Sequence, residues 1–279
     1  MSNLSKRTAY GLALVLGCVT GAVLAHSSGL GGQLRATPVQ EDVAGPVAAT
    51  GSLPEALAPF ASGESAAARN LTGPVIVAGR PKIVVIFDDI GLNKAAYETL
   101  RGLPGPLTFS ILPYVNAPDE LAADALGRGH DVFLHLPMQP TSDEEGAGPG
   151  ALLVSDTPGT IRRKVNRSLN AFSGYSGINN HMGSLFTRDR ARMKIVLSEI
   201  DQRDVFFVDS LTSGSSVAGN VAAQLGMTIL SRDVFLDSDY ENLSTRVIRE
   251  RLGELEAIAL NKGYAVAIAH PYTKTIDTI

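Results

Sequence analysis

The sequence has 279 residues, a formal net charge of -4 and a hydrophobic fraction of 44%. This length leaves room for one sizeable domain and an additional segment. The mildly acidic balance, without a dense stripe of Lys and Arg, gives no reason to expect a nucleic-acid partner.

Residues 1–25 have the pattern of an export signal. Lys6 and Arg7 precede an uncharged stretch, residues 8–25, that is rich in Leu, Val, Ala and Gly. A positive flank before an apolar stretch just long enough to span a bilayer predicts a cleaved signal peptide or an N-terminal membrane anchor. We therefore expect an exported protein, periplasmic or anchored to the outer face of the inner membrane. Cleavage after Ala25 stays open.

The only cysteine, Cys18, lies within this leader. The rest of the chain therefore has no disulfide and no thiolate that could act as a ligand or nucleophile. Any metal ion must be held by nitrogen and oxygen donors.

Residues 26–80 are dominated by Ala, Gly, Ser and Pro and contain few large apolar residues. Because sustained periodicity is absent, this segment is predicted to be a flexible linker. The folded domain is expected to cover residues 81–279.

Within that domain, short apolar runs alternate with amphipathic segments. The predicted strands cover residues 83–87, 107–112, 132–136, 177–179, 205–208, 228–230 and 265–269, and the predicted helices cover residues 94–101, 118–128, 160–172, 188–203, 217–225 and 244–262. This alternation indicates an α/β fold with a parallel sheet covered by helices. A doubly wound sheet or a barrel would satisfy it. We favour a barrel, because polar residues follow nearly every strand.

Two adjacent carboxylates, Asp88 and Asp89, follow the first predicted strand. Side by side after a buried strand they repel each other, so a cation or a proton must relieve the repulsion. The pattern favours one Asp as a metal ligand and the other as a general base that activates water. The structural alternative is that one Asp caps the following helix.

Three histidines, His135, His181 and His270, follow three different strands. A lone histidine at a strand end is more often a hydrogen-bonded structural residue than a ligand. Three of them at the carboxyl ends of parallel strands favour a divalent metal site with acid–base catalysis. His130 precedes its strand, so we expect it at the opposite end of the barrel in a structural role.

Residues 179–184 concentrate amides, an imidazole, a hydroxyl and a glycine in what is predicted to be one loop. Such density suits donors to an oxyanion and groups that orient ligands, and the candidates are Asn179, Asn180 and Ser184.

Further polar residues, Asp209, Arg232 and Asp233, follow the next two strands. They could orient a histidine or pair with one another across the barrel mouth. For Arg232 the structural interpretation is strong, because buried Arg–Asp pairs are common structural devices. The long connection 141–159 is either a lid or substrate wall or a solvated surface excursion.

Five motifs in chain order resemble those of the divergent polysaccharide deacetylase family, a branch of the NodB-like carbohydrate deacetylases. They are Asp-Asp-x-Gly at 88–91, His-Leu-Pro-Met at 135–138, Asn-Asn-His-Met-Gly-Ser at 179–184, Val-Asp-Ser-x-Thr at 208–212 and Ala-His-Pro at 269–271. The resemblance covers residues 82–279. It implies a distorted (β/α)7 barrel and zinc-dependent hydrolysis of acetyl groups from an envelope carbohydrate.

The resemblance also implies roles for single residues. Asp88 matches the general base, Asp89 the metal-binding carboxylate and His135 the first histidine of the metal motif. The second histidine of that motif falls on Gln139, a poor zinc ligand, so His181 is the candidate third ligand.

At the end of the chain, His270 matches the histidine that protonates the leaving amine, and Asp209 would orient it. Arg232 is a further candidate for contacts with substrate, and no definite role is assigned to Asp233. The implied partner is an acetylated amino-sugar polymer or oligosaccharide, and the N-terminal segment would contact the membrane if uncleaved.

Two alternatives stay open. A non-catalytic envelope protein could use the barrel mouth to bind glycan or another protein. Three features favour this alternative: Gln139, the absence of Trp and the short segment after His270. A metal hydrolase that cleaves phosphate esters is disfavoured, because Arg232 alone offers a basic side chain at a strand end.

Overall fold

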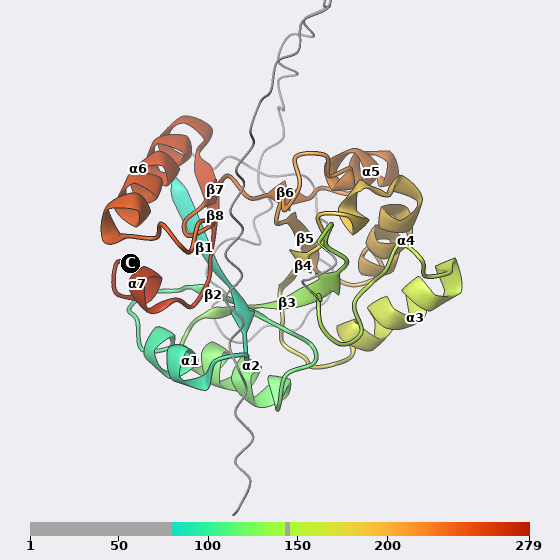
Figure 1. The fold of residues 1–279 in the computed structure, drawn as a ribbon, viewed down its shortest axis with the longest axis horizontal. Helices are drawn as coiled ribbons and strands as arrows, with labels where there is room; N and C mark the ends of the chain where they lie inside the picture. Colours follow the sequence, from blue (N-terminus) through green and yellow to red (C-terminus); the bar gives the residue numbers. More distant parts are fainter. Residues whose placement is uncertain (1–79, 143–145) are drawn as a thin grey trace, which may run out of the picture. The chain divides into compact units, whose positions relative to one another are not determined.

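The computed structural model describes residues 80–142 and 146–279 (Figure 1). The predicted leader and the linker up to residue 79 lie outside the described residues. Within these ranges, none of the helices is long and apolar enough to cross a membrane.

The described chain is an α/β domain in which strands and helices alternate, as the sequence predicts. The strands are β1 (Lys82–Ile90), β2 (Thr108–Ile111), β3 (Asp131–Met138), β4 (Gly177–Met182), β5 (Phe206–Asp209), β6 (Leu230–Ser231), β7 (Val234–Phe235) and β8 (Tyr264–Ala269). The helices are α1 (Lys94–Leu100), α2 (Pro118–Gly127), α3 (Pro158–Leu169), the 3-10 turn η2 (Phe186–Arg188), α4 (Arg190–Ile200), α5 (Ala218–Leu225), α6 (Thr245–Lys262) and α7 (Thr273–Ile276).

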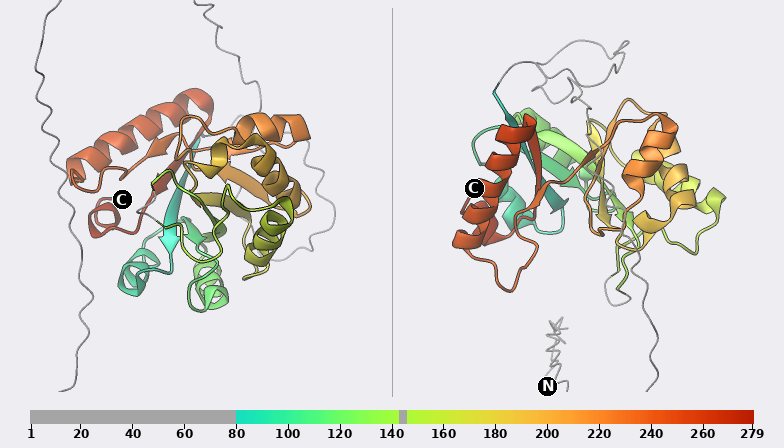
Figure 2. Two further views of the ribbon diagram at one scale, coloured as in Figure 1. Left: turned by 45° about the vertical axis from the view of Figure 1, so that its right-hand side comes forward. Right: turned by 90° about the horizontal axis from the view of Figure 1, so that it is seen from above.

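The strands form one parallel sheet in the order β6-β5-β4-β3-β2-β1-β8-β7. Figures 1 and 2 show this sheet curled, with the helices on its outer side. Its two edge strands, β6 and β7, are consecutive in the chain. The Arg232 N–H donates to Asp209 on the β5 side, and the Asp233 N–H donates to Val266 in β8. Counted as one interrupted strand, β6 and β7 give the curled sheet the seven strands of the distorted (β/α)7 barrel that the family resemblance implies.

The helices cover the sheet through narrow apolar faces. In α3 the apolar residues recur every four positions, and Ile161, Val165 and Leu169 are all buried. This spacing places them on one face of the helix. The basic side chains on the other side are exposed, as expected for a solvated face: Arg162, Arg163 and Arg167.

Strands β1 and β4 extend further than predicted at their carboxyl ends, and this changes where the polar residues lie. Asp88 and Asp89 are inside β1, and Asn179, Asn180 and His181 are inside β4. The prediction that Asn180 and His181 belong to a loop is therefore wrong. A strand whose side chains line a polar site lacks the apolar pattern by which strands are predicted.

Candidate metal-binding and catalytic site

A bulge in β1 brings two adjacent carboxylates to the same side of the strand. Phe87 pairs with Phe109 and Ile90 with Ile111, so β1 carries one extra residue relative to β2. Asp89 within the bulge has a φ of 59°. Such a conformation costs about 1–3 kcal/mol in a residue other than glycine and clusters at functional sites.

In a regular strand neighbouring side chains alternate between faces. Here both carboxylates reach the same imidazole: His135 Nε2 lies 3.5 Å from Asp88 Oδ2 and 3.4 Å from Asp89 Oδ1. The bulge therefore produces a paired-carboxylate arrangement that an unbroken strand could not.

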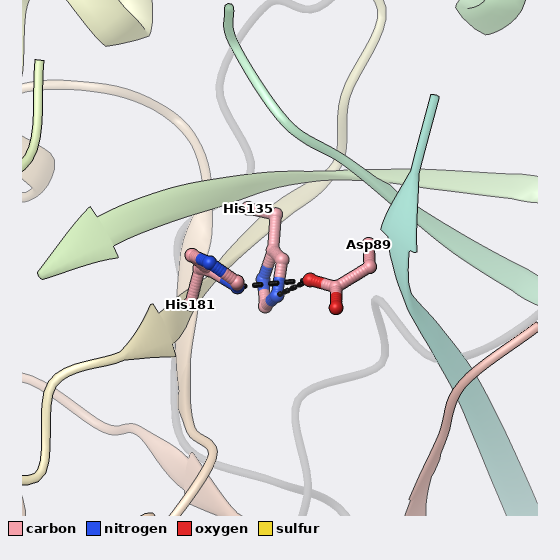
Figure 3. A group of neighbouring side chains, drawn as sticks. All are labelled: Asp89, His135 and His181. Atoms are coloured by element: carbon pink, nitrogen blue, oxygen red, sulfur yellow. Dashed lines mark ion pairs between the residues drawn. The ribbon is translucent and has the colours of Figure 1, made fainter. Parts of the chain in front are cut away.

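Asp89, His135 and His181 form a group with the geometry of metal ligands (Figure 3). Each offers one ligand atom, and these atoms lie within 4.8 Å of one another. His181 Nδ1 is 2.8 Å from Asp89 Oδ1. The two imidazoles come from neighbouring strands, since β3 and β4 pair in register at this level. The donor set of one carboxylate and two imidazoles suits zinc.

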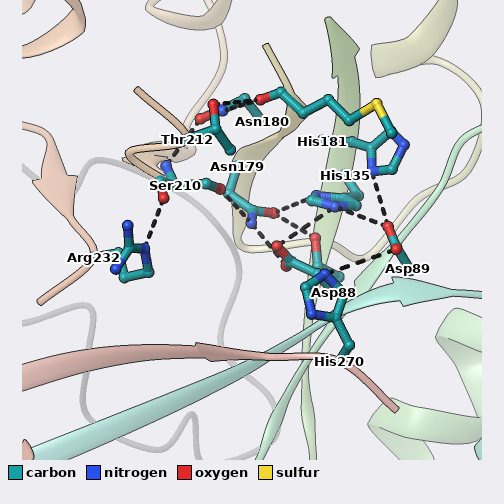
Figure 4. A network of polar contacts seen from close by, with 12 residues as sticks. Asp88, Asp89, His135, Asn179, Asn180, His181, Ser210, Thr212, Arg232 and His270 are labelled. Atoms are coloured by element: carbon teal, nitrogen blue, oxygen red, sulfur yellow. Dashed lines mark hydrogen bonds and ion pairs between the residues drawn. The ribbon is translucent and has the colours of Figure 1, made fainter. Parts of the chain in front are cut away.

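The buried amide of Asn179 organises the site (Figure 4). Its Nδ2 donates to Asp88 Oδ1 at 2.8 Å and to Ser210 Oγ at 3.0 Å. Its Oδ1 accepts from Ser110 Oγ and lies 3.0 Å from His135 Nδ1. A carboxylate can only accept, so the amide nitrogen must face Asp88 and the amide oxygen must face His135.

This orientation determines the tautomer of His135. Because Asn179 Oδ1 can only accept, the proton must sit on His135 Nδ1. In the neutral imidazole the lone pair of Nε2 then points at the two carboxylates. That arrangement is repulsive unless a second proton or a cation lies between them.

Asp89 is the ionised member of the ligand group. Asp89 Oδ1 is buried and accepts no hydrogen bond in the described chain. Burial alone would raise the pKa of Asp89, but His135 and His181 lower it well below its usual range. The carboxylate is therefore ionised and directed at two imidazoles, which is what a divalent cation requires of its ligands.

Asp88 is distinct from the ligands in its burial. It is 4% exposed, and burial raises its pKa above the usual value despite the nearby His135 and His270. A carboxylate of raised pKa beside a metal site is suited to accept a proton from water. The role of Asp88 as general base stays a prediction.

His270 faces the ligands from β8 and is held by Asp237. His270 Nε2 lies 3.8 Å from Asp89 Oδ2, and its Nδ1 lies 3.0 Å from Asp237 Oδ1. Asp237 also accepts from the His270 backbone N–H at 2.7 Å and from the Thr275 hydroxyl at 2.8 Å. Burial opposes protonation, but Asp237 raises the pKa of His270 to about 8.

The expectation that Asp209 orients His270 is wrong. Asp209 Oδ1 accepts from the Leu211 N–H at 3.0 Å and Oδ2 accepts from the Ser216 hydroxyl at 2.7 Å. Asp209 therefore shapes the turn after β5. The sequence did not point to Asp237 because the two-residue strand that precedes it, β7, has too little pattern to be recognised.

The predicted oxyanion donors have other partners. Both N–H groups of the Asn179 amide are donated within the protein, so it offers none to a substrate. The Asn180 amide joins the ends of β4 and β5, donating to Met182 O and accepting from the Ser210 N–H. Ser184 accepts from the Thr141 N–H at 2.9 Å, which links the loops after β3 and β4.

Three remaining candidates also serve the framework. Gln139 Oε1 accepts from the Val154 N–H at 2.8 Å, so this side chain is used to hold the long connection after β3. Arg232 Nε donates to Ser210 O at 2.8 Å. Asp233 pairs with Lys262 at 2.9 Å, and no ion pair of Arg232 occurs in the described ranges.

Comparisons with known proteins agree with this architecture. A family model described as divergent polysaccharide deacetylase matches residues 85–279. An uncharacterized protein of Haemophilus influenzae is 30% identical over 198 residues, which cover 71% of this chain and 69% of that protein. The uncharacterized protein YibQ of Escherichia coli is 30% identical over 209 residues, which cover 75% and 63%. The crystal structure of an uncharacterized Agrobacterium tumefaciens protein matches with a TM-score of 0.68 and 25% identity, covering 73% of this chain and 82% of that one.

Proposed function

The chain belongs to the divergent polysaccharide deacetylase family, and on that premise we propose that it is a metal-dependent hydrolase that removes acetyl groups from an acetylated amino-sugar polymer of the cell envelope. The observation that carries this proposal is the convergence of Asp89, His135 and His181, whose ligand atoms lie within 4.8 Å of one another, with the buried Asp88 beside His135. A non-catalytic barrel has no need of three converging ligand side chains with a second, buried carboxylate beside them.

Asp89, His135 and His181 would hold the metal. A bound divalent cation, zinc in this proposal, supplies a Lewis acid that polarises the acetyl carbonyl and acidifies water. Asn179 keeps the Nε2 lone pair of His135 directed at the site and keeps Asp88 in place through a second hydrogen bond.

Asp88 and His270 would carry the two proton transfers. Asp88, whose pKa burial raises, takes a proton from the attacking water. His270, with a pKa of about 8, is protonated at neutral pH and gives its Nε2 proton to the leaving nitrogen or oxygen of the sugar. Asp237 fixes the imidazole by holding Nδ1, so that Nε2 faces the site. Base and acid thus approach the ligand group from different strands, β1 and β8.

Acetate release tests the proposal. Wild-type protein supplied with zinc should release acetate from N-acetylated glycan polymers or oligosaccharides, and Asp88→Asn should lower the rate by about 10²–10⁴-fold. Asp233→Asn makes the same chemical change at an acidic residue that contacts Lys262 instead of the site, so it should leave the rate unchanged. Zinc-loaded wild type that releases no acetate from any acetylated carbohydrate would reject the proposal.

A non-catalytic glycan- or protein-binding barrel is the second candidate. The use of Gln139 as a structural amide favours it, because this position supplies no ligand. That candidate predicts full biological function in an Asp88→Asn variant, whereas the hydrolase predicts its loss.

We also propose export of the chain, with a periplasmic location or an anchor in the inner membrane, on the strength of residues 1–25. Fractionation of cells that express the full chain tests this directly. Recovery in the cytoplasm would contradict it.

A further inference from the structure

A row of aromatic rings leads from His270 to the surface of the domain. The ring of Phe235 stacks on the imidazole of His270 with centroids 5.4 Å apart, and the ring of Tyr272 stacks on it at 5.3 Å, both with interplanar angles of 29°. Tyr240 follows, with its ring 4.7 Å from that of Tyr272. The proposed general acid is therefore one ring in a continuous series that ends outside the site.

The outer end of this row is open to solvent. Tyr240 is 65% exposed, in contrast to the buried imidazole ligands. It lies in the connection between β7 and α6, and Tyr272 lies in the connection between β8 and α7. Both connections leave the carboxyl ends of their strands, the end where Asp89 and His270 lie. The row thus extends the site along one side instead of opening a separate one.

The connection that carries Tyr240 is held in place by several contacts. Asn242 donates from its backbone N–H and side-chain amide to Asp239, and Lys274 Nζ donates to Leu243 O at 2.9 Å. Leu243 is itself buried. An exposed aromatic ring on a braced loop is already positioned for a ligand, so little ordering cost remains when one binds.

The surface of the row combines the apolar faces of the Tyr240 and Tyr272 rings with their hydroxyl groups. Burial, with the charges of Asp237 and Asp89, raises the pKa of Tyr272 to about 12, so its phenol stays protonated at physiological pH. A phenol ring offers a flat apolar face and a hydrogen-bonding edge. A pyranose ring offers the matching pair, a face of C–H groups bordered by hydroxyls.

We propose that Tyr240 and Tyr272 form a stacking platform for the sugar ring adjacent to the one that is deacetylated. This inference rests on the proposed function, which places the reacting acetyl group between Asp88 and His270. Any neighbouring ring that extends past His270 on this side meets Tyr272 first and Tyr240 next. The platform therefore sets a preference for oligosaccharides over single sugars and fixes the side from which the chain enters.

Binding measurements test the platform apart from catalysis. Calorimetric titration with N-acetylglucosamine and with its β-linked trimer and tetramer should show Tyr240→Ala weakening binding of the oligomers by about tenfold, a change of about 1.4 kcal/mol. Tyr240→Phe keeps the ring but loses the hydroxyl, so it should weaken binding of the oligomers less than Tyr240→Ala does. Leu260→Ala removes another exposed apolar side chain, 74% exposed near the end of α6, and should change nothing.

Kinetics provide a second measurement. In Tyr240→Ala, kcat/KM for the oligomers should fall about tenfold more than kcat/KM for an aryl acetate, which has no second ring. Equal oligomer affinity in wild type and Tyr240→Ala, or no measurable oligomer binding by wild type, would overturn the platform. Ring-dependent binding without acetate release would instead reject the hydrolase and leave the platform standing.

Discussion

Replacing Asn179 by Ala removes the amide that joins the general base to the metal ligands. Asn179 contacts Asp88, His135, Ser110 and Ser210, and it is fully buried. The two serine hydroxyls can rotate toward other partners, but Asp88 and His135 are fixed by their strands. Each buried polar group left without a partner costs about 1–3 kcal/mol, so the free energy of unfolding should fall by about 2–6 kcal/mol.

The same substitution should also weaken metal binding. Loss of a hydrogen-bond partner of a metal-ligating histidine lowers metal affinity by about 10–100-fold. Urea unfolding followed by circular dichroism in the presence of a chelator measures the free energy of unfolding of the metal-free protein. Competition against a zinc chelator measures the affinity for zinc.

Asn180→Ala is the matched control, because Asn180 is equally buried but binds only backbone groups of Met182 and Ser210. It should lower stability without changing metal affinity. A loss of stability below about 1 kcal/mol in Asn179→Ala, or equal metal affinities in the two variants, would refute the role assigned to Asn179.

The remaining predictions concern the acid and the loop beside the site. Asp237→Asn should bring the pKa of His270 from about 8 down toward its ordinary value, as followed by NMR titration of the metal-free protein, and should lower kcat more than it raises KM. Because the folded-state pKa is raised, the stability that Asp237 contributes is present at acidic pH and is lost as pH rises through about 8, so wild type and variant should differ less in Tm at pH 9 than at pH 6. Gly91→Ala should lower the free energy of unfolding by at least about 1 kcal/mol, because φ is +108° and the new Cβ would lie 2.6 Å from Val115. Gly127→Ala, in α2, places its Cβ in open space and should leave Tm unchanged or slightly higher. Equal effects of the two substitutions on Tm would contradict this explanation.

The order of strands and helices could be predicted because apolar periodicity determines it. The boundaries of β1 and β4 could not, since their inward side chains are polar. The motifs predicted that Asp89, His135 and His181 share one metal site, and the structure places their ligand atoms within 4.8 Å of one another. The bulge at Asp88 depends on the register between β1 and β2, which no local pattern in the sequence reveals.

Residues that act through another side chain were the hardest to predict. Asn179 was expected to face the substrate, but its four hydrogen bonds are all internal. Asp209 ends the short strand β5 and Asp237 follows the short strand β7, and only three-dimensional pairing shows that Asp237 is the partner of His270. Gln139 lies at the motif position of a ligand, yet its side chain serves the backbone of the following connection.

Metal stoichiometry and affinity test the central claim most directly. Equilibrium dialysis against zinc, followed by elemental analysis, should give one tightly bound ion per chain in the wild type and a loss of at least about 10–100-fold in affinity in Asp89→Asn and in His181→Ala. Asp233→Asn should bind as the wild type does. Absence of a bound divalent ion in the wild type, or equal affinity in all four proteins, would contradict the assignment of Asp89, His135 and His181 as a single metal site.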